Sequence, residues 1–362
     1  MPGDERSDSA FPHHPRGDDA SRWSEFDRDE LAIALSHYEV GPIRSLRAYR
    51  KGSRRSAKVF IDAEAGEFLL KRRGGGGGDE RPDEDRRVTF SHRLQQRLFH
   101  AGFPLPRLIE TRGGVTALRI DGRTYELFEF IRGNAYDQGL QTTYQSGQAL
   151  ALYHRMLSDF RPDWSPSGGG YHNAPQIAAH LGVIPERTGR EDLDACLARL
   201  RGAYQEAAGA VTRMGFDQWP DQIIHSDWHP GNMLYRGPQV VAVIDYDTAR
   251  RGRRVLDVAN GALQFSVTRV GGDPEGWPEE LDESRLKRFC RGYDSVESAV
   301  ISTAELAALP HLMIEALIVE AVIPIARTGR FAGLDGGSFL RMVERKVRWM
   351  QSRVRQIPEL LA

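Results

Sequence analysis

Residues 223–247 have the sequence Ile-Ile-His-Ser-Asp-Trp-His-Pro-Gly-Asn-Met-Leu-Tyr-Arg-Gly-Pro-Gln-Val-Val-Ala-Val-Ile-Asp-Tyr-Asp, and this stretch decides the fold. It places His225, Asp227 and Asn232 in the spacing His-x-Asp-x-x-x-x-Asn, and an apolar run then ends in Asp245. Four polar residues in this order, in a loop followed by a strand, predict a site in which one short segment gathers several oxygen ligands.

Each of these residue types suits a chemical task. The Asp227 carboxylate can accept the proton of an attacking hydroxyl, while Asn232 and Asp245 offer hard oxygen ligands for Mg²⁺. The Pro-Gly pair at 230–231 supplies the turn, and residues 240–244 are predicted to form a buried strand. The alternative is an ordinary turn without chemistry, which the agreement of four residues in type, order and context disfavours.

Composition indicates a globular protein of two lobes. The chain has 362 residues, 40% of them hydrophobic and 27% charged. A net charge of -1 argues against nucleic acid as a partner. No uninterrupted apolar run approaches the roughly 20 residues of a membrane span, and the N-terminus lacks the apolar core of a secretory signal. With only two cysteines, we expect a cytoplasmic location.

The pattern along the chain predicts a disordered tail at 1–25, a sheet-rich lobe at 26–131 and a helical lobe at 132–362. Strand patterns end near residue 131, apart from the motif segment. The predicted strands are residues 43–50, 57–62, 67–72, 108–111, 117–120 and 124–131. The predicted helices are residues 27–38, 88–101, 145–157, 192–214, 255–268, 281–293, 303–327 and 337–356. Residues 160–190 are interpreted as a Pro/Gly-rich insertion.

With these features the chain resembles the aminoglycoside phosphotransferase/choline kinase family over roughly residues 40–330. The most specific segments are His-Ser-Asp-Trp-His-Pro-Gly-Asn at 225–232 and Ile-Asp-Tyr-Asp at 244–247. Leu-Ala-Leu-Tyr-His at 150–154 is also similar to a helix of that family, and Asp257 is similar to the acid that opens its next helix.

The resemblance implies an α+β, protein-kinase-like bilobal fold that uses ATP (or GTP) and Mg²⁺ to phosphorylate a small hydroxyl compound. Asp227 would then be the base, with Asn232 and Asp245 as metal ligands and His225 as a brace of the loop. Asp247 would add a contact near the metal or the acceptor.

Three departures from protein kinases favour a small-molecule acceptor. Ser226 stands where regulated protein kinases usually have arginine, and Tyr246 and Asp247 follow the metal aspartate in place of Phe-Gly. Only 11 residues separate Asp245 from Asp257, which leaves no room for a long activation loop.

The nucleotide side has weaker signals. Lys71, at the end of a predicted strand, is the candidate that holds the α/β phosphates, although an exposed strand-end lysine is the alternative. The helix at 88–101 contains no acid to pair with it, so either Glu84 or Asp85 takes that place or the pairing is absent. The loop containing Ser53 is a candidate phosphate cover. Backbone groups near Glu129 and Ile131 are candidates to bond adenine, or belong to a simple buried strand.

Candidates on the acceptor side include Trp228 and His229, which flank the base but could equally pack under the loop. Glu315, with Glu320 on the same mostly apolar helix, could hold an amine. Four arginines at 250–254 could bind an anion or form a solvated loop. The insertion at 160–190 could cover the acceptor.

Two functions follow: an active small-molecule kinase, or a catalytically silent nucleotide-binding scaffold, which is suggested by the missing helix acid and by the single glycine in the loop at 50–55. Nothing in the sequence predicts an oligomeric state.

Overall fold

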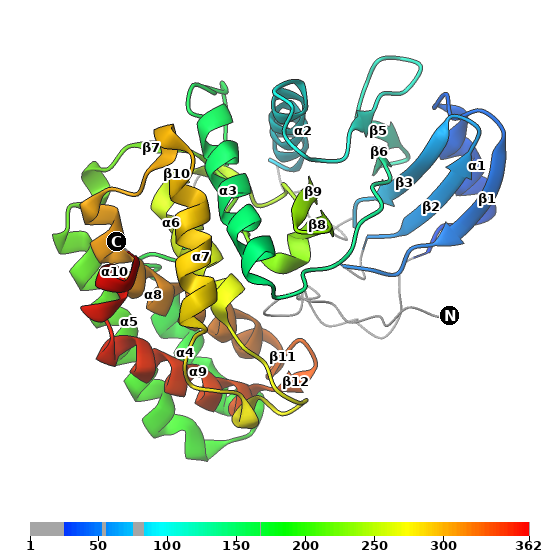
Figure 1. Ribbon diagram of the computed structural model, residues 1–362. Helices are drawn as coiled ribbons and strands as arrows, with labels where there is room; N and C mark the ends of the chain where they lie inside the picture. Colours follow the sequence, from blue (N-terminus) through cyan, green and yellow to red (C-terminus); the bar gives the residue numbers. More distant parts are fainter. Residues whose placement is uncertain (1–24, 53–55, 75–82, 167, 362) are drawn as a thin grey trace.

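The computed structural model describes residues 25–361 except 53–55, 75–82 and 167. Ser53 and almost all of the predicted tail therefore lie outside the described residues. Two parts are visible in Figure 1: a sheet with its helix α1 (Arg28–Ser36), and a larger helical part.

The N-terminal sheet is antiparallel, with the order β1-β2-β3-β6-β4 and β5 paired to β6. Its strands are β1 (Ile43–Ala48), β2 (Lys58–Ala63), β3 (Gly66–Arg72), β4 (Leu108–Ile109), β5 (Leu118–Ile120) and β6 (Arg123–Glu129). All six lie within two residues of the predicted strands at their N-terminal ends, because alternating side chains and Gly-containing turns mark them in the sequence.

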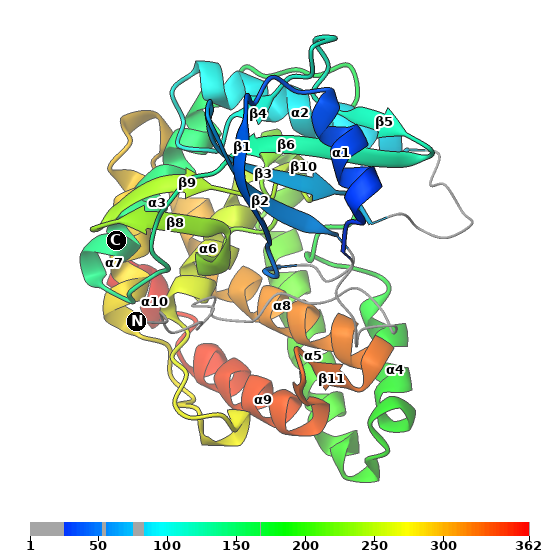
Figure 2. The ribbon, with the colours of Figure 1, turned by 90° about the vertical axis from the view of Figure 1, so that its right-hand side faces the viewer.

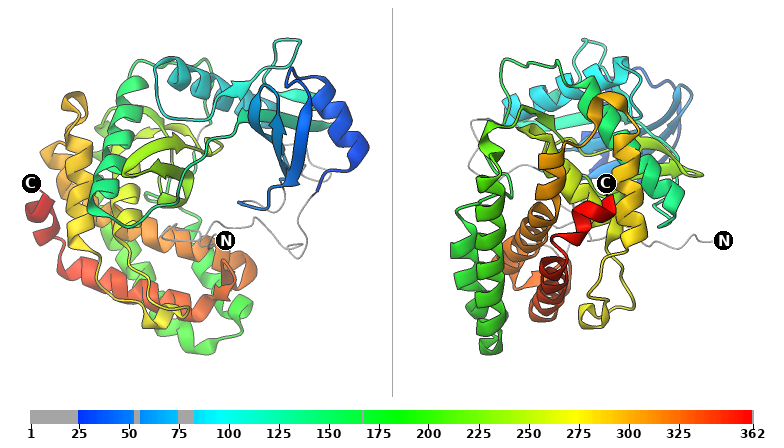
Figure 3. Two further views of the ribbon diagram at one scale, coloured as in Figure 1. Left: turned by 45° about the vertical axis from the view of Figure 1, so that its right-hand side comes forward. Right: turned by 60° about the vertical axis from the view of Figure 1, so that its left-hand side comes forward.

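Alternation along the strands gives the sheet two distinct faces. Val59, Ile61, Leu70 and Leu127 point to one face and form a core with α1, which lies on the outer side of the sheet in Figure 3. The neighbouring residues in each strand point to the opposite face. Lys71 is among them and contacts Asp247 of the C-terminal part, so this second face looks into the space between the lobes.

Helix α2 (Glu84–His100) joins the two parts. It begins four residues before the predicted start, with Glu84 and Asp85 in its first turn. Its apolar residues Phe90, Leu94 and Leu98 belong to the large core of the helical part rather than to the core under α1. The helix therefore packs with the C-terminal lobe while its polar face contacts the sheet.

The C-terminal lobe is mainly helical. Its helices are α3 (Leu140–Met156), α4 (Ile177–Thr188), α5 (Asp194–Arg213), α6 (Arg254–Ser266), α7 (Glu283–Asp294), α8 (Thr303–Thr328), α9 (Gly336–Ser352) and α10 (Gln356–Leu361). Figure 2 shows α8 and α9 beneath the N-terminal sheet. Helix α4 corrects the interpretation of 160–190 as an insertion of loops, because its apolar residues Leu181 and Ile184 complete the core.

Helix α8 is long and apolar enough to cross a membrane by length and composition, but 72% of its most apolar window is buried inside the structure. A capping box between Ser302 and Glu305 starts it. Its composition is thus accounted for by its place at the centre of the large core.

Short strands deliver the motif segment to the interlobe space. They are β7 (Asp221–Ile224), β8 (Met233–Arg236), β9 (Gln239–Val243) and β10 (Arg250–Arg253), with β7 paired to β10 and β8 to β9. A further hairpin joins β11 (Arg330–Phe331) and β12 (Leu334–Asp335). The prediction that strand content ends near 131 outside the motif is wrong for β10 to β12, because pairing with a distant strand, not an apolar pattern, forms the arginine-rich β10.

Helices α3 and α7 lie side by side (Figure 1), and two glycines set their close approach. A Cβ atom on Gly147 would lie 2.0 Å from the Phe289 carbonyl oxygen, and one on Gly292 would lie 2.0 Å from that of Tyr144. The backbones of α3 and α7 are in direct contact here. A rotamer change could not relieve a clash at either glycine, because the nearest atoms belong to the backbone.

We expect Gly147→Ala to destabilise the protein by about 1–3 kcal/mol or more through overpacking. Gly202→Ala in α5, where nothing lies within 4 Å, is the control and should be neutral or stabilising. Thermal unfolding of the two variants measures the difference. Equal melting temperatures would contradict the close packing of α3 on α7.

Candidate active site

The loop after β7 is held in place by Asp257 at the start of α6. The Asp257 carboxylate accepts hydrogen bonds from the backbone N–H groups of His225 and Ser226, each at 2.7 Å. His154 of α3 lies 3.2 Å from the same carboxylate. Ser226 has a φ of 66°, an unusual conformation for a residue other than glycine, and the two bonds to Asp257 hold it there.

His225 braces this loop by packing. Its side chain is fully buried among the rings of Tyr153, Trp228 and Tyr246, and neither ring nitrogen has a hydrogen-bond partner within the described part of the chain. Burial lowers the pKa of His225, which favours a neutral imidazole. Trp228 is also fully buried and has no exposed surface with which to meet an acceptor.

Asn232 fixes Asp227 and keeps one oxygen available. The Asn232 amide nitrogen donates to the Asp227 backbone oxygen and to its carboxylate, both at 3.0 Å. The Asn232 Oδ1 atom is buried and has no hydrogen-bond partner among the described residues. A buried acceptor without a donor fits a cation ligand, because leaving such a group unpaired is costly.

Asp245 lies two residues after the end of β9 and is exposed, with a φ of 67°. The Ile244 N–H donates to the Asn232 backbone oxygen at 2.9 Å, so the two predicted metal ligands are tied through adjacent backbone. Among the described residues, no three His, Cys, Asp or Glu side chains gather into a metal site. Two protein oxygens are compatible with Mg²⁺, which usually keeps several waters and seldom takes a full protein cage.

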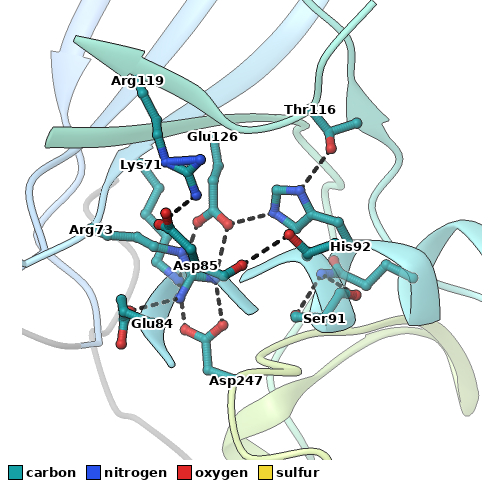
Figure 4. Close-up of polar contacts among 12 residues, drawn as sticks. Lys71, Arg73, Glu84, Asp85, Ser91, His92, Thr116, Arg119, Glu126 and Asp247 are labelled. Carbon is teal, nitrogen blue, oxygen red and sulfur yellow. Dashed lines mark hydrogen bonds and ion pairs between the residues drawn. The ribbon is translucent and has the colours of Figure 1, made fainter. Parts of the chain in front are cut away.

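Lys71 lies in a row of charged side chains across the sheet. It pairs with Lys58 of β2 on one side and with Glu126 of β6 on the other. The Lys71 ammonium is 3.7 Å from the Glu126 carboxylate and 3.1 Å from that of Asp247 (Figure 4). Desolvation opposes its charge, but Asp247 and Glu126 outweigh it and raise the pKa of Lys71.

Arg73 joins the same two carboxylates. It is 2.8 Å from Glu126 and 2.6 Å from Asp247. On the other side of Glu126, the His92 ring of α2 lies at 2.6 Å (Figure 4). Burial alone would raise the pKa of Glu126, but Lys71 and Arg73 outweigh burial and lower it to about 2. Glu126 is thus an ionised carboxylate held by groups from β3 and α2.

Neither acid considered from the sequence pairs with Lys71. Glu84 lies 3.9 Å from Arg73, and Asp85 lies 2.5 Å from Arg119. The partner of Lys71 from its own lobe is Glu126, on a strand rather than a helix, and sequence reasoning missed it. Strand alternation in the sequence shows which residues of β3 share a face with Lys71 and which residues of β6 share a face with Glu126. It does not show that these two residues are neighbours, because that depends on the register between β3 and β6.

The adenine-binding candidates lie at the end of β6. The Glu129 N–H already donates to the Arg107 carbonyl at 2.9 Å, so it is engaged within the sheet. Ile131 lies two residues beyond the strand and is half-buried. Their proposed contacts with adenine remain predictions.

His229 and Glu320 are two further titratable residues near Asp227. The His229 Nδ1 atom accepts the Gly231 N–H at 3.0 Å, and its Nε2 atom is 3.5 Å from the Asp227 carboxylate. Burial opposes protonation of His229, but Asp227 and Glu320 raise its pKa. The Glu320 carboxylate accepts a hydrogen bond from Gln264, and burial raises the pKa of Glu320 to about 8.

Glu315, the acid named first from the sequence, has structural partners. Its carboxylate is buried and bonds the His172 ring at 2.9 Å and the Asn173 N–H at 2.8 Å. These contacts tie the segment after α3 to α8. A role for Glu315 in binding an acceptor stays untested, and these contacts explain its burial without one.

The arginines at 250–254 are engaged in structural contacts. Arg250 bonds the Ser226 hydroxyl at 2.8 Å and the carbonyls of Gly168 and Gly169. The other three pair with acids, Arg251 and Arg253 with Asp221 and Arg254 with Glu305. These contacts account for the cluster without an anionic acceptor.

Comparison with known proteins agrees with this geometry. A family model described as the phosphotransferase enzyme family matches residues 45–305. The homoserine kinase of Beijerinckia indica subsp. indica is 25% identical over 231 residues, 64% of this chain and 67% of the relative. That of Neisseria meningitidis serogroup B is 25% identical over 299 residues, 80% of this chain and 88% of the relative.

Solved structures show the same fold. A microcompartment-associated aminopropanol kinase matches with a TM-score of 0.66 and 16% identity, covering 92% of this chain and 99% of the other. An aminoglycoside phosphotransferase from Alicyclobacillus acidocaldarius matches with a TM-score of 0.62 and 17% identity, covering 90% and 95%. The predicted α+β, protein-kinase-like bilobal fold is confirmed. Because the family model spans well over half of its length, the chain belongs to the phosphotransferase enzyme family.

Proposed function

We propose that this protein transfers the γ-phosphoryl group of ATP to a hydroxyl of a small molecule that also carries an amine. The observation that carries the proposal is the joint position of Asp227, Asn232 and Asp245 opposite the row that contains Lys71. These positions support the proposal that a base, two metal ligands and a phosphate-binding cation act together in the space between the lobes.

Asp227 would accept the proton of the acceptor hydroxyl, with its carboxylate oriented by the Asn232 amide at 3.0 Å. Mg²⁺, held by Asn232 Oδ1 and Asp245, would neutralise charge on the phosphate oxygens. Lys71 and Arg73 would hold the phosphates once these displace Asp247. The same sheet face carries Phe60, a buried ring that packs edge-on against Phe130 with 4.8 Å between the ring centroids.

ATP is the donor we propose rather than GTP, because related structures were solved with AMP-PNP or ADP. We propose a cytoplasmic location, because ATP is available there.

The acceptor proposal rests on Glu320. It is an acid close enough to His229 and Asp227 to affect their electrostatics, and Gln264 orients it. The arginines at 250–254 are engaged elsewhere, which favours a cationic over an anionic acceptor group. Relatives named homoserine kinase, aminopropanol kinase and choline kinase have amine-bearing hydroxyl compounds in their names.

The silent scaffold was suggested by the absence of an acid on the helix at 88–101 and by the single glycine in the loop at 50–55. Glu126, which His92 contacts, is an acidic partner of Lys71 and argues against the first of these two reasons. The direct test is a screen for ATP consumption with Mg²⁺ over paired hydroxyl compounds, with and without an amine. Turnover confined to amine-free compounds would contradict the acceptor class, and no turnover at all would contradict the kinase.

We expect Asp227→Ala to lower kcat by at least about 10²-fold, the scale of a lost general base, with near-normal binding of Mg-ATP. Steady-state kinetics and calorimetry on the same preparation separate the two quantities. Unchanged turnover would remove Asp227 from the mechanism.

We expect Asp245→Ala to weaken nucleotide binding in Mg²⁺ because it removes a metal ligand. The control is the same titration in EDTA, where wild type and variant should bind ATP alike. If the variant binds Mg-ATP as tightly as wild type, Asp245 does not hold the metal.

The pH dependence of acceptor binding tests Glu320. With its pKa raised to about 8, the carboxyl is mostly protonated at lower pH, and an ammonium binds the ionised form. The acceptor KM should therefore fall as pH rises toward about 8, by up to about tenfold per unit, and then level off. Glu320→Gln should raise KM and abolish this dependence while the KM for ATP stays unchanged. A retained pH dependence in the variant would assign it to another group.

A further inference from the structure

Lys58 is a second lysine on the face of the sheet that looks into the interlobe space. It lies directly opposite Lys71 in the β2–β3 ladder, and Lys71 lies directly opposite Glu126 in the β3–β6 ladder. Directly opposed residues in antiparallel strands share a face and have close Cβ atoms. Lys58, Lys71 and Glu126 therefore form one row, with Lys58 at its outer end beside the loop before β2.

The contacts of Lys58 differ from those of its neighbours. Its ammonium donates to the Lys51 carbonyl at 2.7 Å and lies under Gly52, where an added Cβ would be 3.0 Å away. Lys71 and Arg73 each contact both Glu126 and Asp247. Among the described residues, no carboxylate lies within ion-pairing distance of Lys58.

This arrangement is costly without an anion. Like charges directly opposite each other destabilise a sheet. Burial and the charge of Lys71 lower the pKa of Lys58 to about 8, although Asp245 and Asp247 oppose the shift. A lysine used only to brace the loop would not need a charge, since any side-chain donor can bond the Lys51 carbonyl.

We propose that Lys58 is a second phosphate-binding lysine, which contacts the polyphosphate of the bound nucleotide together with Lys71. The inference rests on the proposed function, because it assumes that the nucleotide lies against this row. Lys71 and Arg73 must first exchange Asp247 for phosphate, whereas Lys58 has no carboxylate to release among the residues that the structure describes. Lys58 is thus the cation of the row that is ready to receive an anion.

The test compares Lys58→Gln, which keeps a donor for the Lys51 carbonyl but removes the charge, with Lys58→Arg, which keeps the charge. Lys287→Gln on α7 removes the same charge from the C-terminal lobe and is the matched control. Calorimetry with Mg²⁺ measures the binding of ATP, tripolyphosphate and adenosine to each full-length variant.

We expect Lys58→Gln to bind ATP and tripolyphosphate about tenfold or more weakly, the scale of a lost charge-assisted contact, with adenosine unchanged. Lys58→Arg and Lys287→Gln should bind all three like wild type. Wild-type affinity in Lys58→Gln, or an equal loss for adenosine, would assign Lys58 to bracing the loop and overturn the proposal.

The folding of Lys58→Gln is checked by its melting temperature, which should equal or exceed that of wild type because a like-charge pair is removed. These binding measurements need no acceptor, so they separate this inference from the proposed function. Wild type that turns over an amino alcohol while Lys58→Gln binds ATP normally would refute only the role of Lys58. Wild type without any turnover would refute the proposed function itself.

Discussion

The buried carboxylate of Asp257 is the constraint on which the catalytic lobe depends. It receives the backbone N–H groups of His225 and Ser226 at 2.7 Å and lies beside His154, so α3, α6 and the loop after β7 meet at one group. Hydrogen bonds to a charged acceptor are stronger than those between neutral groups. The two hydrogen bonds to Asp257 hold Ser226 in a backbone conformation that it would not adopt alone. The direction of the Asp227 side chain follows from that conformation. Through this loop Asp257 positions Asp227, the residue that we propose as the base.

Glu126 has the corresponding place in the N-terminal lobe. It is a fully buried acid whose neighbours are Lys71, Arg73 and His92, so it links the sheet to α2. The apolar side of α2 packs into the large core of the helical lobe. The contact between His92 and Glu126 therefore connects the N-terminal sheet to a helix that belongs to the other lobe. An acid on a strand partner holds Lys71 more directly than one on α2 would, since the register of β3 and β6 fixes their relation.

The sequence predicted those parts of the fold and site that are encoded locally. The strands of the N-terminal sheet follow from alternation, and the loop carrying Asp227 and Asn232 follows from residue type and spacing. What required the structure was long-range pairing. Lys71 and Glu126 are 55 positions apart and meet only through sheet register. Helix α4 was hidden by the glycines and prolines around it, and β10 has no apolar pattern because Arg250, Arg251 and Arg253 point to partners far along the chain. The sequence provided no reason to assign different roles to Glu315 and Glu320, which are five residues apart on one helix. In the structure Glu315 bonds His172 and Asn173, whereas Glu320 lies near His229 and Asp227.

The charges between the lobes would couple the proposed nucleotide binding to the arrangement of the lobes. Three cations, Lys58, Lys71 and Arg73, face two carboxylates, Glu126 and Asp247. Glu126 is fixed within its own lobe. Asp247 belongs to the opposite lobe and forms ion pairs with Lys71 and Arg73, the cations that would bind phosphates. In the proposed function, a polyphosphate would compete with Asp247 for Lys71 and Arg73. The released Asp247 would then lie two residues from Asp245, where we propose that a divalent cation binds. A metal ion bound with the nucleotide would compensate the charge of the displaced carboxylate, so that each would favour binding of the other.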